Sequence, residues 1–368
     1  GSLVEGLTIV ITGAGSGIGR ALALGFLDDG ARVVVADIRA IATVSLLAPT
    51  LVLLALSARP AKAAFTPGDN PRTLTHDSNS RVYRIRAPIS YDGTQPVPLV
   101  VDLHGFGSSK EQQQAISGMQ QRAEVEGFLV AYPDGLFQSW NAGVCCGDAV
   151  ANAIDDVGFL RAMVSAIQAE GNVDVSRIYT TGLSNGGAMT HRLACEAADL
   201  FAAAAPLAFP TPYADFESEC QPSRQIPVLL FMGLSDVVIP YESGAFGGAV
   251  ESFDFWRTKN SCGPEPIEPQ ISLGGSFCDL DESCADETQI GLCSIRGSAL
   301  APPLDQFSGH ILYVNDDGLD LSAMIWSFFE QGSPVPERPP IPFLGHAGRV
   351  GLTSLLLVAS FVRLRKQR

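Results

Sequence analysis

Ile178-Tyr-Thr-Thr-Gly182-Leu-Ser184-Asn-Gly186-Gly-Ala-Met189 is the stretch of this sequence that decides the fold. An apolar strand pattern runs into Gly-x-Ser-x-Gly, and a helix pattern follows at once. Glycines flank the serine because, in a turn this tight, side chains there would collide with neighbouring strands. The turn strains Ser184, exposes its hydroxyl, and directs the positive helix N-terminus at a developing oxyanion. The stretch therefore predicts a serine nucleophile, with a plain glycine-rich turn as the alternative.

A serine nucleophile needs a base, and the chain holds five histidines. His191 lies seven residues after the serine on the same predicted helix, about 10 Å away by helix rise, so it cannot reach. His346 belongs to the C-terminal tail, and His76 precedes the main body. His104 belongs to a separate loop, described below. Elimination leaves His310, just before the last amphipathic helix pattern.

The acid should fall between the serine and the histidine along the chain. Residues 228–233 form a buried strand pattern, and Asp236 follows it. At a carboxyl end of a strand, Asp236 would orient the imidazole and stabilise its cation. A turn or cap aspartate is the alternative. Asp254 and Asp286 are second choices, since neither follows so clear a strand.

A second loop should supply an oxyanion donor. Residues 98–107 form a strand that opens into His-Gly-x-Gly. We expect one donor to be the backbone N–H of Phe106 and the other the N–H of Asn185. His104 should brace this loop, and it is a candidate substrate-binding residue together with Trp140. Trp140 could line an acyl pocket or pack with the adjacent cysteines.

These segments resemble the extracellular poly(3-hydroxybutyrate) depolymerase and feruloyl esterase group of α/β-hydrolases. The resemblance spans nearly all of residues 80–330, and its matching segments are residues 101–107, 132–135, 139–147, 155–160, 182–187, 233–236 and 309–310. It implies a mostly parallel sheet with helices on both faces. It also implies a triad of Ser184, Asp236 and His310 that hydrolyses polyhydroxyalkanoates, feruloylated or acetylated xylan, or short acyl esters. No metal or organic cofactor is expected.

Two features depart from this family pattern. The family commonly carries a Gly-rich His-Thr-Trp-Pro stretch around the base, whereas Ile-Leu-Tyr follows His310 here. The segment from Cys262 to Cys293 is also unfamiliar. Both departures bear on which ester is the substrate.

Composition narrows the classes of partner. Of 368 residues, 46% are hydrophobic and 17% charged, and the net charge is −15. A strongly negative charge excludes a nucleic-acid partner.

The even cysteine count favours disulfides in an exported protein, and the absence of Cys-x-x-Cys disfavours a zinc site. We expect adjacent Cys145 and Cys146 to bond different partners, because a vicinal disulfide is strained. The cysteines are Cys145, Cys146, Cys195, Cys220, Cys262, Cys278, Cys284 and Cys293.

Residues 1–40 resemble the opening of a short-chain dehydrogenase. Glycines between a strand and a helix would let the backbone approach a pyrophosphate, and an aspartate would hold a ribose hydroxyl. The vestigial cofactor-binding candidates are Gly13, Gly17, Gly19 and Asp37. Two strands and one helix cannot build a nicotinamide site, and no tyrosine has a lysine four positions on. We interpret residues 1–40 as a partial Rossmann βαβ fragment.

The remaining segments suggest export. Residues 41–64 combine a preceding charge, an apolar run and Ala-x-Ala, which is typical of a signal peptide. Residues 65–332 form the predicted esterase domain. Residues 333–368 hold a Pro-rich linker, an apolar stretch and a basic tail, a pattern of bacterial sorting signals and of membrane or cell-surface attachment. A secreted or surface-held protein of bacterial type is predicted.

Three hypotheses follow. The first is a secreted serine esterase acting on an ester substrate, which could be a polymeric polyester or polysaccharide ester. The second is an NAD(P)-dependent short-chain oxidoreductase, which only the N-terminal glycine motif supports. The third is a non-catalytic surface binding module on a hydrolase scaffold, against which the complete triad argues.

Overall fold

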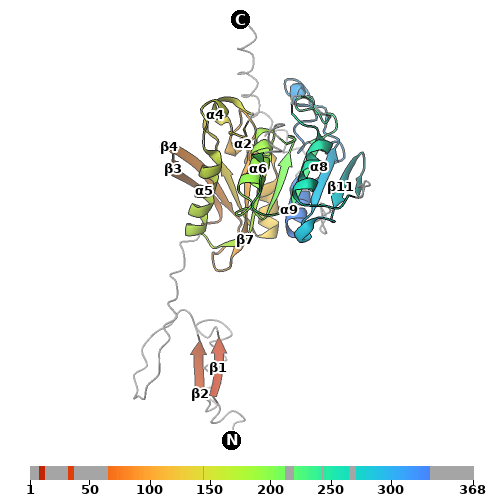
Figure 1. Ribbon diagram of the computed structural model, residues 1–368. Coiled ribbons are helices and arrows are strands. Elements are labelled where there is room, and N and C mark those ends of the chain that lie inside the picture. Colours follow the sequence, from red (N-terminus) through yellow and green to blue (C-terminus); the bar gives the residue numbers. More distant parts are fainter. Residues whose placement is uncertain are drawn as a thin grey trace. The chain divides into compact units, whose positions relative to one another are not determined.

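The computed structural model describes residues 65–143, 145–211, 219–242, 244, 246–264 and 271–331, and the backbone of two strands near the N-terminus (Figure 1). The chain divides into two compact units, Gly1–Ala61 and Lys62–Arg368.

In the first unit, β1 (Thr8–Thr12) and β2 (Arg32–Ala36) pair in parallel. The predicted cofactor-motif residues Gly13, Gly17, Gly19 and Asp37 lie outside the described residues. So do the signal-like segment, residues 41–64, and the C-terminal segment from residue 332 onward.

A ten-stranded sheet organises the second unit. From β12 to β6 in the sheet order, neighbouring strands run parallel, and antiparallel pairs occupy both ends. The prediction of a mostly parallel α/β-hydrolase sheet is confirmed. In sheet order the strands are β10 (Ile271–Leu273), β11 (Ser276–Asp281), β12 (Ile290–Ile295), β9 (Val228–Gly233), β8 (Ala203–Leu207), β7 (Val173–Leu183), β5 (Val97–Leu103), β6 (Leu129–Pro133), β4 (Asn79–Ala87) and β3 (Gly68–His76).

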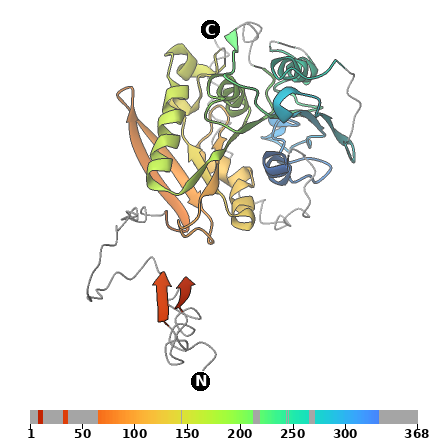
Figure 2. The same cartoon turned by 60° about the horizontal axis from the view of Figure 1, so that its bottom comes forward.

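Helices cover both faces of the sheet, as predicted (Figures 1 and 2). Successive residues of a strand point to opposite faces, and β9 shows this: Val228 and Leu230 join one core cluster, Leu229 and Phe231 the other. Apolar side chains of α5, α6 and α8 pack in the first cluster, those of α3 and α9 in the second. The helices are α2 (Lys110–Ile116), α3 (Met119–Glu126), α4 (Gly147–Ala151), α5 (Asp156–Glu170), α6 (Asn185–Glu196), α8 (Ala249–Lys259), α9 (Leu321–Gln331) and the short η1 (Leu136–Gln138), η2 (Ala285–Glu287) and η3 (Asp305–Phe307).

Within the described part of the chain, no helix combines the length and apolarity that crossing a membrane requires.

All eight cysteines are paired. The bonds are Cys145–Cys146, Cys195–Cys220, Cys262–Cys284 and Cys278–Cys293. Our expectation of separate partners for Cys145 and Cys146 was wrong: they bond each other, because the other six cysteines pair among themselves. Disulfides on this scale are typical of proteins from oxidising, extracellular compartments.

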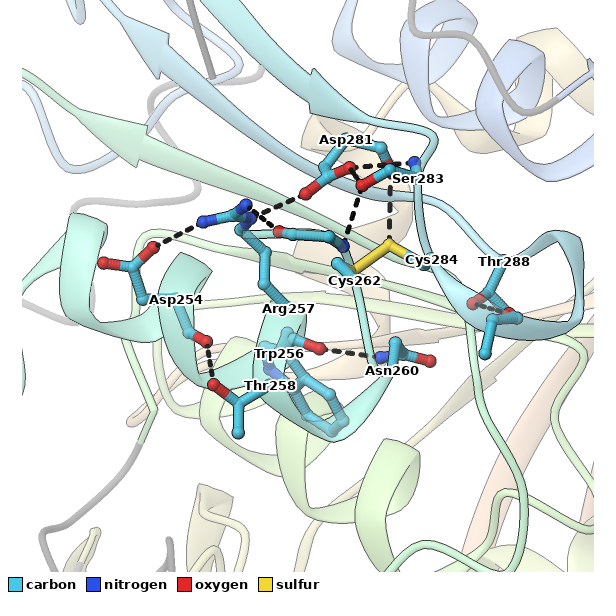
Figure 3. The surroundings of a disulfide bond; sticks show 12 residues. Asp254, Trp256, Arg257, Thr258, Asn260, Cys262, Asp281, Ser283, Cys284 and Thr288 are labelled. Atoms are coloured by element: carbon cyan, nitrogen blue, oxygen red, sulfur yellow. Dashed lines mark hydrogen bonds and ion pairs between the residues drawn. A yellow bond between two sulfur atoms is a disulfide. The ribbon is translucent and has the colours of Figure 1, made fainter. Parts of the chain in front are cut away.

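The unfamiliar segment between Cys262 and Cys293 extends the sheet. It supplies β10 and β11 and ends in β12, where Cys278 and Cys293 stand directly opposite each other. The second disulfide, Cys262–Cys284, joins the end of α8 to the turn after β11 (Figure 3). Beside it, Arg257 Nε donates to Asp281 Oδ2 at 2.7 Å. Covalent and ionic links thus hold this edge of the sheet to α8.

Candidate active site

Ser184 occupies the sharp turn between β7 and α6. Its backbone has φ 58° and ψ −120°, a strained conformation for a residue with a side chain. Its N–H donates to the Leu207 carbonyl at 2.8 Å. A Cβ added to Gly186 would come within 2.7 Å of the His104 carbonyl oxygen. Glycine is therefore required there, as the Gly-x-Ser-x-Gly pattern predicts.

His310 and Asp236 come together from loops after η3 and β9. His310 Nδ1 lies 2.7 Å from Asp236 Oδ2, and both side chains are buried. The other carboxylate oxygen, Oδ1, accepts from the N–H groups of Val238 and Ile239 at 2.8 and 2.9 Å. The loops meet closely at Gly309 (φ 70°), where a Cβ would lie 2.9 Å from the Asp236 nitrogen. The carboxylate therefore holds a fixed position against the imidazole.

Ser184 and His310 line one cavity of about 80 Å³ at the carboxyl edge of the sheet. Its apolar walls come from Phe106, Ile116, Leu183, Phe307 and Ile311, and its polar walls from Ser108, Gln112 and Gln113. We name it the serine cavity. Apolar walls around a few polar groups are typical of small-molecule sites.

The predicted oxyanion loop lies against the serine. A Cβ on Gly105 would be 3.4 Å from the Ser184 Cβ. Phe106 is 52% exposed, and its side chain lines the serine cavity. On the other side of the turn, the Asn185 side chain accepts from the Trp140 N–H at 2.7 Å and donates back to the Trp140 carbonyl. The position of Asn185, one of the two expected donors, is therefore braced by hydrogen bonds.

His104 and Trp140 lie behind this loop. Both are fully buried, and neither lines the serine cavity. His104 Nδ1 is 2.8 Å from the Gly105 carbonyl oxygen, and Nε2 accepts from the Gly135 N–H at 3.0 Å. Burial lowers the pKa of His104. Trp140 Nε1 donates to the His104 carbonyl at 2.9 Å. This geometry suits bracing, and neither residue presents surface to a substrate.

Two other histidines are engaged elsewhere. His191 is fully buried, with Nδ1 accepting from Trp256 Nε1 at 2.9 Å and Nε2 donating to the Phe209 carbonyl at 3.1 Å. Burial lowers the pKa of His191 to about 3. We expected His76 to precede the main body, but it lies within it. It ends β3, and its Nε2 lies 3.0 Å from Asp155 Oδ2.

The two second-choice aspartates, Asp254 and Asp286, lie away from the serine cavity. Asp254 lies on α8 and pairs with Arg257 (Figure 3). Asp286 lies in η2 with left-handed backbone, φ 54°. Neither lines the serine cavity.

A buried polar group in the cavity wall was not predicted from the sequence. Gln113 on α2 is fully buried and lines the serine cavity. Its Nε2 donates to Asp102 Oδ1 at 2.7 Å and to the Tyr313 hydroxyl at 3.2 Å. Burial raises the pKa of Asp102 to about 7. The available signal was a lone acid inside the apolar strand that precedes His104.

Side chains of the types that bind metal ions lie close together at two places among the described residues. One is Cys262, Cys284 and Asp281, whose sulfurs are already in a disulfide. The other is His76 with Asp77 and Asp155, on the exposed end of β3. Neither group lines the serine cavity.

The sheet order and the strand–turn–helix at Ser184 define an α/β-hydrolase. No family model matches the chain. Its relatives include feruloyl esterase B of Piromyces equi, 34% identical over 59% of this chain and 42% of that protein. A protein named probable feruloyl esterase C, from Aspergillus niger, is 31% identical over 61% of this chain and 80% of its own length.

The chain belongs to the feruloyl esterase C family. The chain spans less than two thirds of the length of two relatives outside this family: 42% of feruloyl esterase B and 58% of a second esterase relative. Among solved structures, acetyl xylan esterase from Aspergillus awamori aligns with a TM-score of 0.48 at 16% identity, over 61% of this chain and 92% of that one.

Proposed function

We propose that this protein is a serine hydrolase of carboxylic esters, with Ser184 as nucleophile, His310 as base and Asp236 as acid. One observation carries the proposal: His310 meets Asp236 through Nδ1 at 2.7 Å and lines the same cavity as Ser184. With Nδ1–H donated to the carboxylate, Nε2 is the basic nitrogen.

The mechanism is acyl transfer in two halves. The Ser184 hydroxyl attacks the ester carbonyl while His310 Nε2 takes its proton. The N–H groups of Phe106 and Asn185 stabilise the oxyanion of the tetrahedral intermediate. His310 passes the proton to the leaving alcohol, and an acyl ester remains on the serine. His310 Nε2 then takes a proton from a water molecule that attacks this ester, and it returns the proton to the Ser184 oxygen as the acid leaves.

The substrate class follows from the cavity and the relatives' names. The apolar walls of the serine cavity suit the ring of a hydroxycinnamoyl group, and the relatives are named feruloyl esterases. Acetyl and other short acyl esters are smaller versions of the same substrate, and a polysaccharide or polyester would present them in a polymer. We also propose a secreted, bacterial-type location, with surface attachment through residues 333–368, and the domain limits given above.

Substitution of the nucleophile tests the function. Ser184→Ala should lower kcat on methyl ferulate and p-nitrophenyl acetate by about 10⁴-fold or more, with unchanged circular dichroism. The matched control is Ser90→Ala, an exposed serine that does not line the serine cavity, and it should keep full activity. Full turnover in Ser184→Ala would refute the proposal.

A further inference from the structure

The loop between η1 and α4 carries the Cys145–Cys146 disulfide, which has no part in the proposed mechanism. Inside this loop, the Cys146 N–H donates to the Trp140 carbonyl at 3.3 Å, and the Ala142 N–H donates to the Cys145 carbonyl at 3.0 Å. The loop therefore folds back on itself, and the two cysteines lie where it closes. We name residues 139–146 the disulfide loop.

The disulfide loop holds Asn185, the residue directly after the nucleophile. The Asn185 side chain is fully buried. Its Oδ1 accepts from the Trp140 N–H at 2.7 Å, and its Nδ2 donates to the carbonyls of Trp140 and Cys145 at 3.1 and 3.2 Å. A buried amide that is bonded at both ends keeps one orientation, because an unpaired buried polar group is costly. The loop thus positions the residue whose N–H is an expected oxyanion donor.

The end of the same loop contacts Phe106, the other expected donor. A Cβ added to Gly147, the residue after Cys146, would lie 2.5 Å from Phe106 Cε2. Gly147 has φ 65°, a left-handed conformation that favours glycine. The Phe106 ring therefore packs against the backbone that immediately follows the disulfide. Both expected donors contact this part of the chain, Asn185 at Cys145 and Phe106 at Gly147.

The position of this disulfide in the sequence favours a local role. The other three disulfides join residues that are 25, 22 and 15 positions apart, whereas Cys145 and Cys146 are adjacent. A disulfide constrains the unfolded chain more when it closes a longer loop, so this one contributes least to global stability. A link between neighbours closes a small ring that contains their peptide bond. That ring restricts the backbone at the carbonyl that accepts from Asn185.

We infer that the Cys145–Cys146 disulfide positions the oxyanion hole, because it holds the disulfide loop against Asn185 and Phe106. The inference rests on the proposed esterase function and adds two positioning residues to it. Neither cysteine lines the serine cavity. Oxyanion donors act on the transition state, so loss of the disulfide should lower kcat and leave KM nearly unchanged.

Substitution of both cysteines tests the inference. In Cys145→Ser, Cys146→Ser, we expect kcat on p-nitrophenyl acetate to fall about 10- to 100-fold, because small displacements of catalytic groups are costly. KM should stay within about twofold of wild type. A trifluoromethyl ketone forms an anionic tetrahedral adduct with an activated serine, and it should bind more weakly by the same factor as kcat falls.

The matched control is Cys262→Ser, Cys284→Ser. It removes another disulfide between half-buried residues, at the edge of the sheet that holds β11. Both kcat and the affinity for the ketone should equal those of wild type. Unchanged kcat in Cys145→Ser, Cys146→Ser would overturn the inference, and so would a rise in KM without a fall in kcat.

Reduction provides a second test that needs no substitution at this site. One thiolate of a small dithiol attacks a cysteine sulfur and breaks the S–S bond. Its second thiol displaces the mixed disulfide, so that the dithiol leaves as a cyclic disulfide and Cys145 and Cys146 become two thiols. In the control variant, kcat should fall as alkylation and peptide mass spectrometry detect these thiols, and it should recover on reoxidation. Full kcat with both thiols present would overturn the inference.

Hydrogen exchange separates the inference from the proposed function. In protein with isotope-labelled asparagine, NMR follows the side-chain amide protons of Asn185. They should exchange at least about tenfold faster in Cys145→Ser, Cys146→Ser than in wild type. Equal exchange rates would overturn the inference, whatever the turnover. Faster exchange in a protein whose wild type hydrolyses no ester would support the positioning of Asn185 and refute the esterase function alone.

Discussion

Asp236 is the residue whose expected role depends most on exact position. Its Oδ2 meets the imidazole, and its Oδ1 is tied to the N–H groups of Val238 and Ile239. Asp236→Asn would keep the size of the side chain but remove the negative charge that fixes the tautomer and stabilises the imidazolium. We expect kcat on p-nitrophenyl acetate to fall by about 10³- to 10⁴-fold, with little change in KM.

Steady-state kinetics on purified Asp236→Asn measures this. Asp254→Asn is the control, because Asp254 lies on α8 and pairs with Arg257; its kcat should equal that of wild type. A loss of less than about tenfold in Asp236→Asn would assign the acid role to another group.

Asp102 makes stability depend on pH. It is fully buried, and its pKa rises to about 7 from the ordinary value of 3.8. The folded protein therefore binds a proton that the unfolded chain releases between these pH values. The contribution of Asp102 to the free energy of unfolding is largest below about pH 4. It declines as the pH rises to about 7 and stays constant above that. The decline is about 4 kcal/mol.

Asp102→Asn removes this dependence and keeps the acceptor for Gln113. Urea unfolding at pH 4.5 and pH 8 should show that the variant gains stability relative to wild type as the pH rises. A difference between variant and wild type that is the same at both pH values would contradict the assignment.

At the scale of elements, the disulfide between β11 and β12 should contribute measurably. Cys278 and Cys293 are fully buried and separated by 15 positions. Closing a loop of that size stabilises a fold by about 3 kcal/mol. The double variant Cys278→Ser, Cys293→Ser should lose about that much unfolding free energy in guanidinium titrations.

The same titrations with reductant provide the comparison. Reduced wild type should lose more stability than the double variant, because three further bonds open. If the double variant, measured without reductant, is as stable as wild type, the pairing of β11 with β12 needs no covalent link and the prediction is contradicted.

Elements with local signals could be predicted from sequence, and elements set by distant contacts could not. The β7–Ser184–α6 turn has a periodicity change and glycines at fixed positions, so its geometry was predicted correctly. The last helix, α9, was also predicted. The strands within residues 262–293 were not, because β10 and β11 are short and find their partners only in the folded sheet. Likewise, the Cys145–Cys146 bond follows from which cysteines the fold leaves unpaired.

At the scale of the whole molecule, the fold class was predicted from the motifs and from the family resemblance that they carry, and it is confirmed. The site residues stay predictions about chemistry, although Ser184 and His310 line one cavity. The buried Asp102–Gln113 pair could not be predicted, because it depends on how α2 packs against β5. No local pattern encodes such distances.

Disulfide content is a property of the whole chain that can be counted. All eight cysteines are paired. Purified, unreduced protein denatured in guanidinium should therefore give no reaction with a thiol reagent. Complete reduction should release eight thiols per chain. Free thiols before reduction would contradict the pairing and the oxidising location inferred from it.

The most direct measurement of the central claim is to map the site of covalent inhibition. A fluorophosphonate probe reacts with a serine activated by a neighbouring base. Peptide mass spectrometry of the labelled protein should find one adduct, on Ser184, and His310→Ala should abolish it. Labelling of a different residue, or equal labelling of Ser184 in His310→Ala, would contradict the account.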